Sequence, residues 1–229
     1  MVNSHAAPAD DEVPIDPDAK PLALFDMDGT LTDPADGITA CHVWACAEVG
    51  VTIDPAAATA LMGMVAEDMH RELGVPADVV AESTRLYRER FAVAGWLEDK
   101  PYDGIVELIA SLHDAGYVIG VATMKLEPFA ERIVERVGLT PYISVVAGSD
   151  AARTRITKRA IIERAVELTG ATPSGVAMIG DRHHDIDAAR GLGYTAIGAA
   201  WGYGSIEELM RANAHAIANV PADVAEFLL

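Results

Sequence analysis

Two aspartates stand directly after a short apolar run near the start of the chain. The run 22–25 is followed by Asp26, Met27, Asp28 and Gly29. The aspartates are two residues apart on extended backbone, so both carboxylates start on one side of the chain, and glycine frees the backbone for a tight turn. Acids at the end of an apolar strand are costly without a compensating cation or hydrogen bonds. The pair therefore predicts a site for a hard divalent cation such as Mg²⁺, which takes carboxylate and phosphate oxygens as ligands.

Two other local structures also place acids before a glycine: a helix or turn cap, and a calcium-binding loop. Helix caps or turn caps need only one acid each, so a pair exceeds what capping requires. A calcium loop of the form Asp-x-Asp-x-Asp-Gly has glycine at its sixth position, whereas Gly29 is at the fourth. We therefore reject the calcium loop and favour the magnesium site over simple capping.

Further polar residues follow the later apolar runs of the chain. Thr123, Met124 and Lys125 follow the second run, Lys158 opens the helix after the third, and the segment 180–185 (Gly-Asp-Arg-His-His-Asp) follows the fourth. Ligands of open parallel sheets bind beyond the carboxyl ends of the strands. These residues should therefore meet the two aspartates of the first run at one edge of a sheet.

The elements that would position these residues alternate along the chain. Strand-like apolar runs occur at residues 22–25, 117–122, 142–147, 176–179 and 195–197. Amphipathic stretches near residues 105–115, 127–137 and 158–169 indicate helices between them. This alternation predicts an α/β fold with a parallel sheet covered by helices on both faces.

One segment interrupts the alternation. Residues 37–101 contain helical patterns, near 38–49, 56–73 and 77–94, and no convincing strand. We therefore expect a helical insertion after the first strand. The predicted division is an acidic tail over residues 1–20 without a role in the chemistry, an α/β core formed by 21–36 and 102–229, and a helical domain over 37–101.

Composition excludes several classes of partner. The formal net charge of −18, from 35 acidic and 17 basic residues, disfavours binding to nucleic acid or to an anionic membrane. No stretch approaches the roughly 20 apolar residues that span a bilayer, and the N-terminus lacks the pattern of a signal peptide. Cys41 and Cys46 lie outside any Cys/His cluster, so we expect free thiols in the cytoplasm.

Four motifs together resemble those of the haloacid dehalogenase (HAD) superfamily. They are Asp-Met-Asp-Gly-Thr-Leu-Thr-Asp at 26–33, Val-Ala-Thr at 121–123, Lys158 at the end of 154–158, and Gly-Asp-Arg-His-His-Asp-Ile at 180–186. The resemblance spans residues 21–229. Within the superfamily, the chain is similar to the phosphoglycolate phosphatase and 5′-nucleotidase branch. It implies a Rossmann-like three-layer core with a helical cap inserted after the first strand.

The resemblance also implies catalytic roles. Asp26 would be the nucleophile that takes the phosphoryl group, and Asp28 would protonate the leaving oxygen and then activate water. Thr123 and Lys158 would bind the phosphoryl oxygens. Gly29 and the backbone at Met124, where relatives usually have Ser or Asn, would complete this phosphate site.

The resemblance likewise implies Mg²⁺ as the cofactor. Its ligands would be the Asp26 carboxylate, the backbone carbonyl of Asp28, and Asp181. Asp185 would support this metal shell or Lys158. His183 and His184 lie in the same motif, and we favour hydrogen bonds in the loop over metal binding for both.

The expected activity is hydrolysis of a small phosphate monoester, of the phosphoglycolate or nucleoside 5′-monophosphate type, through an aspartyl-phosphate. Asp28 favours phosphate chemistry over carbon–halogen cleavage, because a halide leaves without a proton and an alkoxide gains from one. The alternative is a phosphotransferase or phosphomutase that passes the phosphoryl group to an acceptor other than water. A third reading, a binding module with a decayed site, is disfavoured because every catalytic position is intact. The expected partner is a small phosphorylated metabolite, and the chain is expected to be a monomer or homodimer.

Three further positions leave alternatives open. Lys125 either contacts phosphate or caps a helix. Met62 and Met64 either form an adaptable apolar loop over the substrate or pack in the core of the helical domain, which we favour. The arginines at 85, 88 and 90 either attract an anionic substrate or face solvent, and we favour solvent.

Overall fold

The fold is built on one parallel sheet, as predicted. The computed structural model describes residues 20–152, 154–172 and 175–229, so the predicted acidic tail lies outside the described residues except for Lys20. Each neighbouring pair of strands in the sheet is parallel, with Phe25 beside Val121 on one side and Ile179 on the other. The strand order is β5 (Ile143–Ser149), β4 (Val118–Leu126), β1 (Leu22–Phe25), β6 (Val176–Gly180), β7 (Thr195–Ala199), β8 (Ala216–Ala218).

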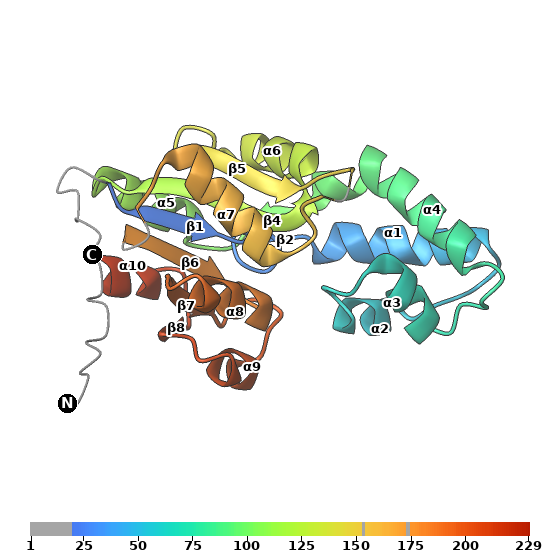
Figure 1. Ribbon diagram of the computed structural model, residues 1–229. Helices are drawn as coiled ribbons and strands as arrows, with labels where there is room; N and C mark the ends of the chain where they lie inside the picture. The colour runs from blue at the N-terminus through green and yellow to red at the C-terminus, as the bar shows by residue number, and fades with distance from the viewer. Residues whose placement is uncertain (1–19, 153, 173–174) are drawn as a thin grey trace, which may run out of the picture.

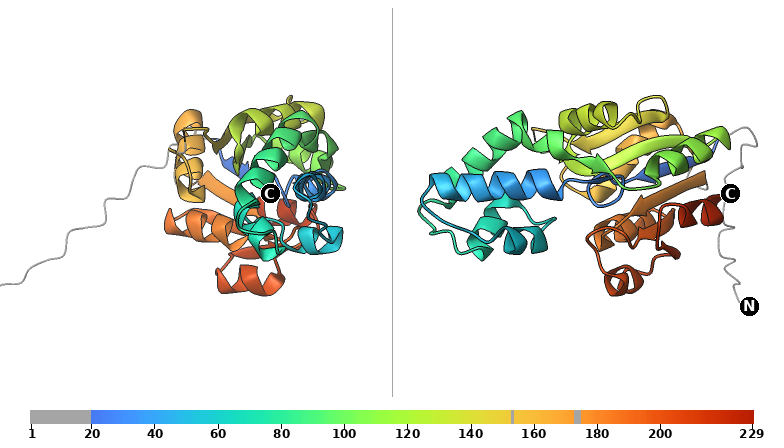
Figure 2. Two further views of the ribbon diagram at one scale, coloured as in Figure 1. Left: turned by 90° about the vertical axis from the view of Figure 1, so that its right-hand side faces the viewer. Right: turned by 180° about the vertical axis from the view of Figure 1, so that it is seen from behind.

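Helices cover both faces of the sheet and make three layers (Figures 1 and 2). Successive residues of β1 point to opposite faces, so Leu22 and Leu24 join one buried cluster while Ala23 and Phe25 join the other. The first cluster includes side chains of α7 (Lys158–Thr169), α8 (His183–Gly191) and α9 (Ile206–Arg211). The second includes side chains of α5 (Ile105–Asp114), α6 (Glu127–Arg136) and α10 (Asp223–Leu228).

The segment between the first strand and the rest of the sheet is helical and lies beyond the carboxyl ends of the strands (Figure 1). Its inserted helices are α1 (Ala35–Glu48), α2 (Pro55–Ala60), α3 (Ala66–Glu72) and α4 (Val80–Val93), followed by the 3₁₀ turn η1 (Gly95–Glu98). The chain enters this segment through β2 (Thr32–Asp33) and leaves it through β3 (Lys100–Pro101), and these two short strands pair in antiparallel fashion. Among the described residues, no helix has the length and apolar character to cross a membrane.

The helix predicted over 56–73 is wrong as a single element. The structure has two short helices, α2 and α3, separated by a turn at residues 61–64. Gly63 lies in this turn with a φ of +91°, a conformation that glycine adopts without the penalty paid by other residues. A Cβ atom at Gly63 would also lie 2.6 Å from Nη1 of Arg182 in the core. The turn therefore brings the inserted helices close to the sheet edge, which a continuous helix would not do.

Candidate active site

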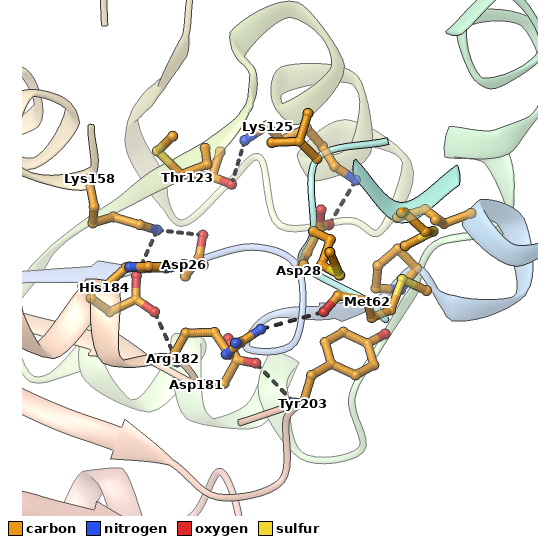
Figure 3. A pocket seen from close by; sticks show the side chains of 18 of the residues that line it. Asp26, Asp28, Met62, Thr123, Lys125, Lys158, Asp181, Arg182, His184 and Tyr203 are labelled. Carbon is orange, nitrogen blue, oxygen red and sulfur yellow. Dashed lines mark hydrogen bonds and ion pairs between the residues drawn. The ribbon is translucent and has the colours of Figure 1, made fainter. Parts of the chain in front are cut away.

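Lys158 connects two of the predicted acids at the carboxyl edge of the sheet (Figure 3). Its Nζ lies 2.9 Å from Oδ1 of Asp26 and 2.7 Å from Oδ1 of Asp185, and donates to the carbonyl of Ala122 at 2.9 Å. Burial opposes the charge of this lysine, but the carboxylates of Asp185 and Asp26 outweigh it and raise the pKa of Lys158. The ammonium is thus a fixed positive charge beside Asp26.

Asp26, Asp181 and Asp185 offer three carboxylate oxygens that lie within 4.8 Å of one another. Asp181 is fully buried and has no basic side chain within ion-pair distance among the described residues. Its contacts are the hydroxyl of Thr30, which donates to Oδ1 at 3.3 Å, and the N–H of Tyr203, which donates to Oδ2 at 2.9 Å. Buried charges are usually paired or bind metals. The donor set and this uncompensated carboxylate therefore fit a hard divalent cation such as Mg²⁺.

Gly29 makes room for this carboxylate group. It has a φ of +83°, and a Cβ atom there would collide with the carboxylate of Asp181. The turn that Gly29 permits therefore lets the first strand's loop pass directly over Asp181. Sequence reasoning did not assign Thr30 or Tyr203 to the site, although Thr30 is part of the first motif.

We expect Mg²⁺ to stabilise the protein more at pH 8 than at pH 6. Burial, with the neighbouring carboxylates of Asp26 and Asp185, raises the pKa of Asp181 to about 7 from 3.8. A raised folded-state pKa contributes stability below about pH 4 that is lost as the pH rises through 7, so the metal-free protein weakens across this window. Mg²⁺ binds the ionised carboxylate. It therefore offsets the largest loss of stability at high pH. The measurement is the Mg²⁺-induced change in Tm at both pH values, and equal changes would contradict the expectation.

Asp28 lies apart from the three-carboxylate group and pairs with Lys125. Oδ1 of Asp28 is 2.7 Å from Nζ of Lys125, which is also 3.1 Å from Oδ2 of Asp99. The Asp28 side chain is 31% exposed, yet this surface borders a cavity beside the inserted helices, and desolvation there raises its pKa. A carboxyl group with a raised pKa is suited to donate a proton near neutral pH.

Asp99 is the residue that sequence reasoning missed here. It is fully buried at the chain crossing just before β3, and burial raises its pKa to about 6. Lys125 thus pairs with the carboxylate at the end of η1 and also lines the cavity, so its contact with phosphate stays a prediction. Lys125 thereby links Asp28 to Asp99, which lies where the chain returns from the inserted helices to the core.

Replacing Lys125 with methionine is expected to destabilise the protein by about 3–5 kcal/mol, because breaking a buried ion pair leaves a buried charge without compensation. The side chains of Lys125 and Asp99 are 6% and 0% exposed. Chemical denaturation measures the free energy of unfolding. The matched control is Lys100→Met, since Lys100 is 65% exposed and pairs with an exposed Asp36, so this change should stay within about 1 kcal/mol. Similar losses in both variants would contradict the assignment.

A cavity of about 520 Å³ lies between the sheet edge and the inserted helices. Its core side includes Thr123 and Met124 of β4 with the charged residues above. Lys125 N–H donates to Oγ1 of Thr123 at 3.2 Å, while the Met124 side chain is 44% exposed. The cavity wall from the inserted helices and their connecting turn consists of Ile38, His42, Met62, Gly63, Met64, Val65, Met69, Tyr87 and Phe91.

The turn between α2 and α3 borders this cavity directly. Met62 is buried and Met64 is 42% exposed, and both line the cavity. The Met62 carbonyl lies 3.5 Å from Nη1 of Arg182, at the outer limit for a hydrogen bond. Arg182 is further held by Glu208, whose Oε1 accepts from its Nε at 2.9 Å. We favoured packing of both methionines among the inserted helices. Met62 is buried but also lines the cavity, and Met64 is too exposed to be a core residue.

The two histidines of the last motif lie at the start of α8. Nδ1 of His183 is 3.1 Å from Oδ2 of Asp187, on the exposed side of the helix. His184 borders the cavity, but neither histidine belongs to the three-carboxylate group. Among the described residues, the side chains at this edge that could bind a metal are therefore carboxylates.

Comparison with known proteins agrees with this geometry. A family model described as haloacid dehalogenase-like hydrolase matches residues 23–199. The chain is 35% identical over 207 residues to a 5′-nucleotidase of Pseudomonas aeruginosa, covering 90% of this chain and 92% of that one. A solved structure described as a predicted phosphatase from Clostridium acetobutylicum superposes with a TM-score of 0.81 at 31% identity, covering 92% of this chain and 98% of that chain.

A further relative bears the name of a kinase. The chain is 34% identical over 184 residues to the tyrosine-protein kinase PtkA of Mycobacterium tuberculosis, covering 80% of this chain. It spans 63% of the length of that relative, less than two thirds.

The fold and the acidic, lysine-bearing sheet edge define a hydrolase of the α/β class with an inserted helical segment. The chain belongs to the haloacid dehalogenase-like hydrolase family.

Proposed function

We propose that this protein is a Mg²⁺-dependent phosphatase that hydrolyses small phosphate monoesters through a phosphorylated Asp26. The observation that supports it best is the contact of Lys158 Nζ with both Asp26 and Asp185, at 2.9 and 2.7 Å, beside the buried carboxylate of Asp181. A nucleophile, a fixed cation and a metal-binding donor set thus border one cavity.

Asp26 is proposed as the nucleophile. Its Oδ1 accepts from Met27 N–H at 2.7 Å and contacts Lys158, which holds the carboxylate in one orientation. Attack by the carboxylate on phosphorus forms the aspartyl-phosphate as the bond from phosphorus to the ester oxygen breaks. Water then attacks the same phosphorus and releases inorganic phosphate, restoring the free carboxylate.

Asp28 is proposed as the acid and then the base. The departing alkoxide takes the proton of its carboxyl group, and the resulting carboxylate later takes a proton from the attacking water. The raised pKa of Asp28 favours the protonated form in the first step. Its ion pair with Lys125 supports the ionised form in the second.

Positive charge at the site is proposed to stabilise the transferred phosphoryl group. Lys158 and the Thr123 hydroxyl are placed to donate to its oxygens, with backbone N–H groups near Gly29 and Met124 as further donors. Asp26, Asp181 and the Asp28 backbone carbonyl would hold Mg²⁺, with Asp185 supporting the shell and Lys158. Bound there, the ion would neutralise developing negative charge on the phosphoryl oxygens.

The inserted helices are proposed to act as a cap domain over residues 37–101, hinged on the core formed by 21–36 and 102–229. The paired crossings at β2 and β3 and the contact between Arg182 and the Met62 carbonyl support this. Cap closure would exclude water and seat the leaving group.

We propose a small phosphorylated metabolite as the substrate and a monomer or homodimer as the active form. We also propose the cytoplasm as the location, which the two free buried cysteines support.

A second function, transfer of the phosphoryl group to an acceptor other than water, is motivated by the relative named as a tyrosine kinase. Product analysis separates the two. Phosphatase activity predicts Mg²⁺-dependent release of inorganic phosphate from substrate alone, abolished by a chelator and restored by Mg²⁺. A phosphotransferase would release little phosphate until an acceptor is added, and that result would overturn the proposal.

A further inference from the structure

A chain of hydrogen bonds within the inserted helices determines the chemistry of His42, which borders the cavity. Nδ1 of His42 lies 2.8 Å from Nε2 of His70, and Nδ1 of His70 lies 2.8 Å from Oγ of Ser83. Oγ of Ser83 also lies 3.0 Å from the carbonyl of Val80. All members of this chain are buried, so each of these three contacts should be a hydrogen bond.

One placement of protons satisfies all three contacts. The Val80 carbonyl can only accept, so the Ser83 hydroxyl donates to it and Oγ accepts from Nδ1–H of His70. Nε2 of His70 is then the acceptor of Nδ1–H from His42. Because burial, with the neighbouring His70, lowers the pKa of His42 to about 3, its ring is neutral and Nε2 carries no proton. Within the described residues this Nε2 has no hydrogen-bond partner, so His42 offers the cavity an acceptor.

The rest of the cap wall is apolar and aromatic. Ile38, Met69 and Phe91 line it, Met62 lies across the cavity from Asp26 and Lys158 (Figure 3), and Tyr87 stacks on the His42 ring with centroids 3.9 Å apart. The inserted helices contribute no lysine or arginine to the lining. Arg85 pairs with Glu82 and Glu89 at the surface, and Arg90 lies over Trp44.

The cations on the core side are already compensated. Lys158 pairs with Asp26 and Asp185, Lys125 with Asp28 and Asp99, and Arg182 with Glu208. Burial lowers the pKa of His184, so this residue adds no positive charge. A second anionic group on the substrate would therefore meet apolar side chains, the uncharged Tyr87 and an unprotonated imidazole, and a charge without a cation there is costly.

The cavity is also larger than a two-carbon leaving group requires. Phosphoglycolate has nine non-hydrogen atoms, which at liquid water's share of about 30 Å³ each occupy about 270 Å³. The cavity holds about 520 Å³. Space therefore remains beside the cap wall for a leaving group larger than glycolate.

We propose that the substrate is a phosphate monoester of an uncharged, ring-bearing alcohol whose N–H or O–H group donates to Nε2 of His42, as a nucleoside 5′-monophosphate does, and that phosphoglycolate is a poor substrate. This inference rests on the proposed phosphatase activity. It assigns substrate choice to the acceptor at His42 and to the absence of a free cation on the cap wall.

The first experiment compares three substrates with alkyl leaving groups under one set of Mg²⁺ conditions. They are uridine 5′-monophosphate, which carries donors, benzyl phosphate, which is apolar without a donor, and phosphoglycolate, which carries a carboxylate. We expect kcat/KM to fall in that order, with at least about tenfold between the first and the last, because the first substrate gains a hydrogen bond and the last buries an uncompensated charge. Equal or better turnover of phosphoglycolate would overturn the inference.

Two variants test the two parts of the inference separately. His42→Phe keeps the ring stacked on Tyr87 and removes the acceptor, so the ratio of kcat/KM for uridine 5′-monophosphate to that for benzyl phosphate should fall about tenfold. Met64→Arg adds a cation at a lining position that is 42% exposed, so the ratio for phosphoglycolate to that for benzyl phosphate should rise about tenfold. Unchanged ratios in folded variants would contradict the assignment.

Ser83→Ala provides a second test of the acceptor if His42→Phe does not fold. Ser83 does not line the cavity, and its loss leaves Nδ1 of His70 with only the longer contact to Oγ1 of Thr84, at 3.5 Å, among the described residues. The same ratio should fall in this variant, and an unchanged ratio would contradict the proposed chain. Failure of the inference is distinguishable from failure of the phosphatase proposal: hydrolysis in the wrong order of preference overturns only the inference, whereas no hydrolysis of any of the three overturns the activity as well.

Discussion

Asp26→Asn is expected to lower phosphate release by about four orders of magnitude or more while the fold stays intact. The amide cannot act as the nucleophile, and loss of an enzyme's nucleophile costs on the order of 10⁶-fold in comparable cases. The fold should survive because an amide oxygen can still accept from Met27 N–H and from Lys158, which keeps its contact with Asp185. The measurements are phosphate release, Tm, and the acid-trapped phosphoenzyme, which should be absent.

Asp187→Asn is the matched control for this variant. Asp187 lies on α8, two residues after Asp185, and its side chain is 61% exposed and pairs with His183. The same chemical change there should alter activity by less than about twofold, since surface substitutions rarely exceed 0.5 kcal/mol. Near-normal activity of the Asp26 variant would rule out Asp26 as the nucleophile and, with it, the proposed mechanism.

Asp28→Asn is expected to lower turnover of alkyl phosphates by about 10²–10⁴-fold, the range for loss of a general acid–base group. The loss should depend on the leaving group. Formation of the phosphoenzyme from 4-nitrophenyl phosphate should fall much less, because that phenolate leaves without a proton. Hydrolysis of the phosphoenzyme should still be slow because water has lost its base, so rapid-quench kinetics should reveal a burst followed by slow release.

The control for Asp28 concerns its ion pair. Asp28→Asn leaves Lys125 paired with Asp99 at 3.1 Å, so the change in Tm should be small beside that of Lys125→Met. A loss of activity that is equal for 4-nitrophenyl and alkyl substrates in the first step would contradict the acid role. A large drop in Tm would instead assign Asp28 mainly to stability.

Much of the core followed from local pattern. The apolar runs at 22–25 and 176–179 became β1 and β6 within one residue, because strands buried on both faces need uninterrupted apolar sequence. The short strand β8, Ala216–Ala218, has only three residues and was not predicted, since so short a run carries no periodic signal. The break between α2 and α3 was missed because Gly63 reads as a tolerated helical glycine until the approach of Arg182 is known.

The gathering of Asp26, Asp181 and Asp185 near Lys158 was also predictable, because each follows or opens an element whose end lies at one edge of a parallel sheet. The positions of Lys125 and Asp99 were not. Asp99 stands in an irregular segment with no motif around it, and its contact with Lys125 of β4 joins residues 26 apart in the chain.

The sequence by itself thus determined the sheet, its helical insertion and the set of groups at the carboxyl edge, since these depend on residue type and on spacing along the chain. The tertiary structure alone decided which groups pair with one another, which carboxylate stays uncompensated and that His42 borders the cavity. Such pairings depend on distances of a few ångströms between segments far apart in sequence, and hydrogen bonds and buried charges change their energies steeply over that range.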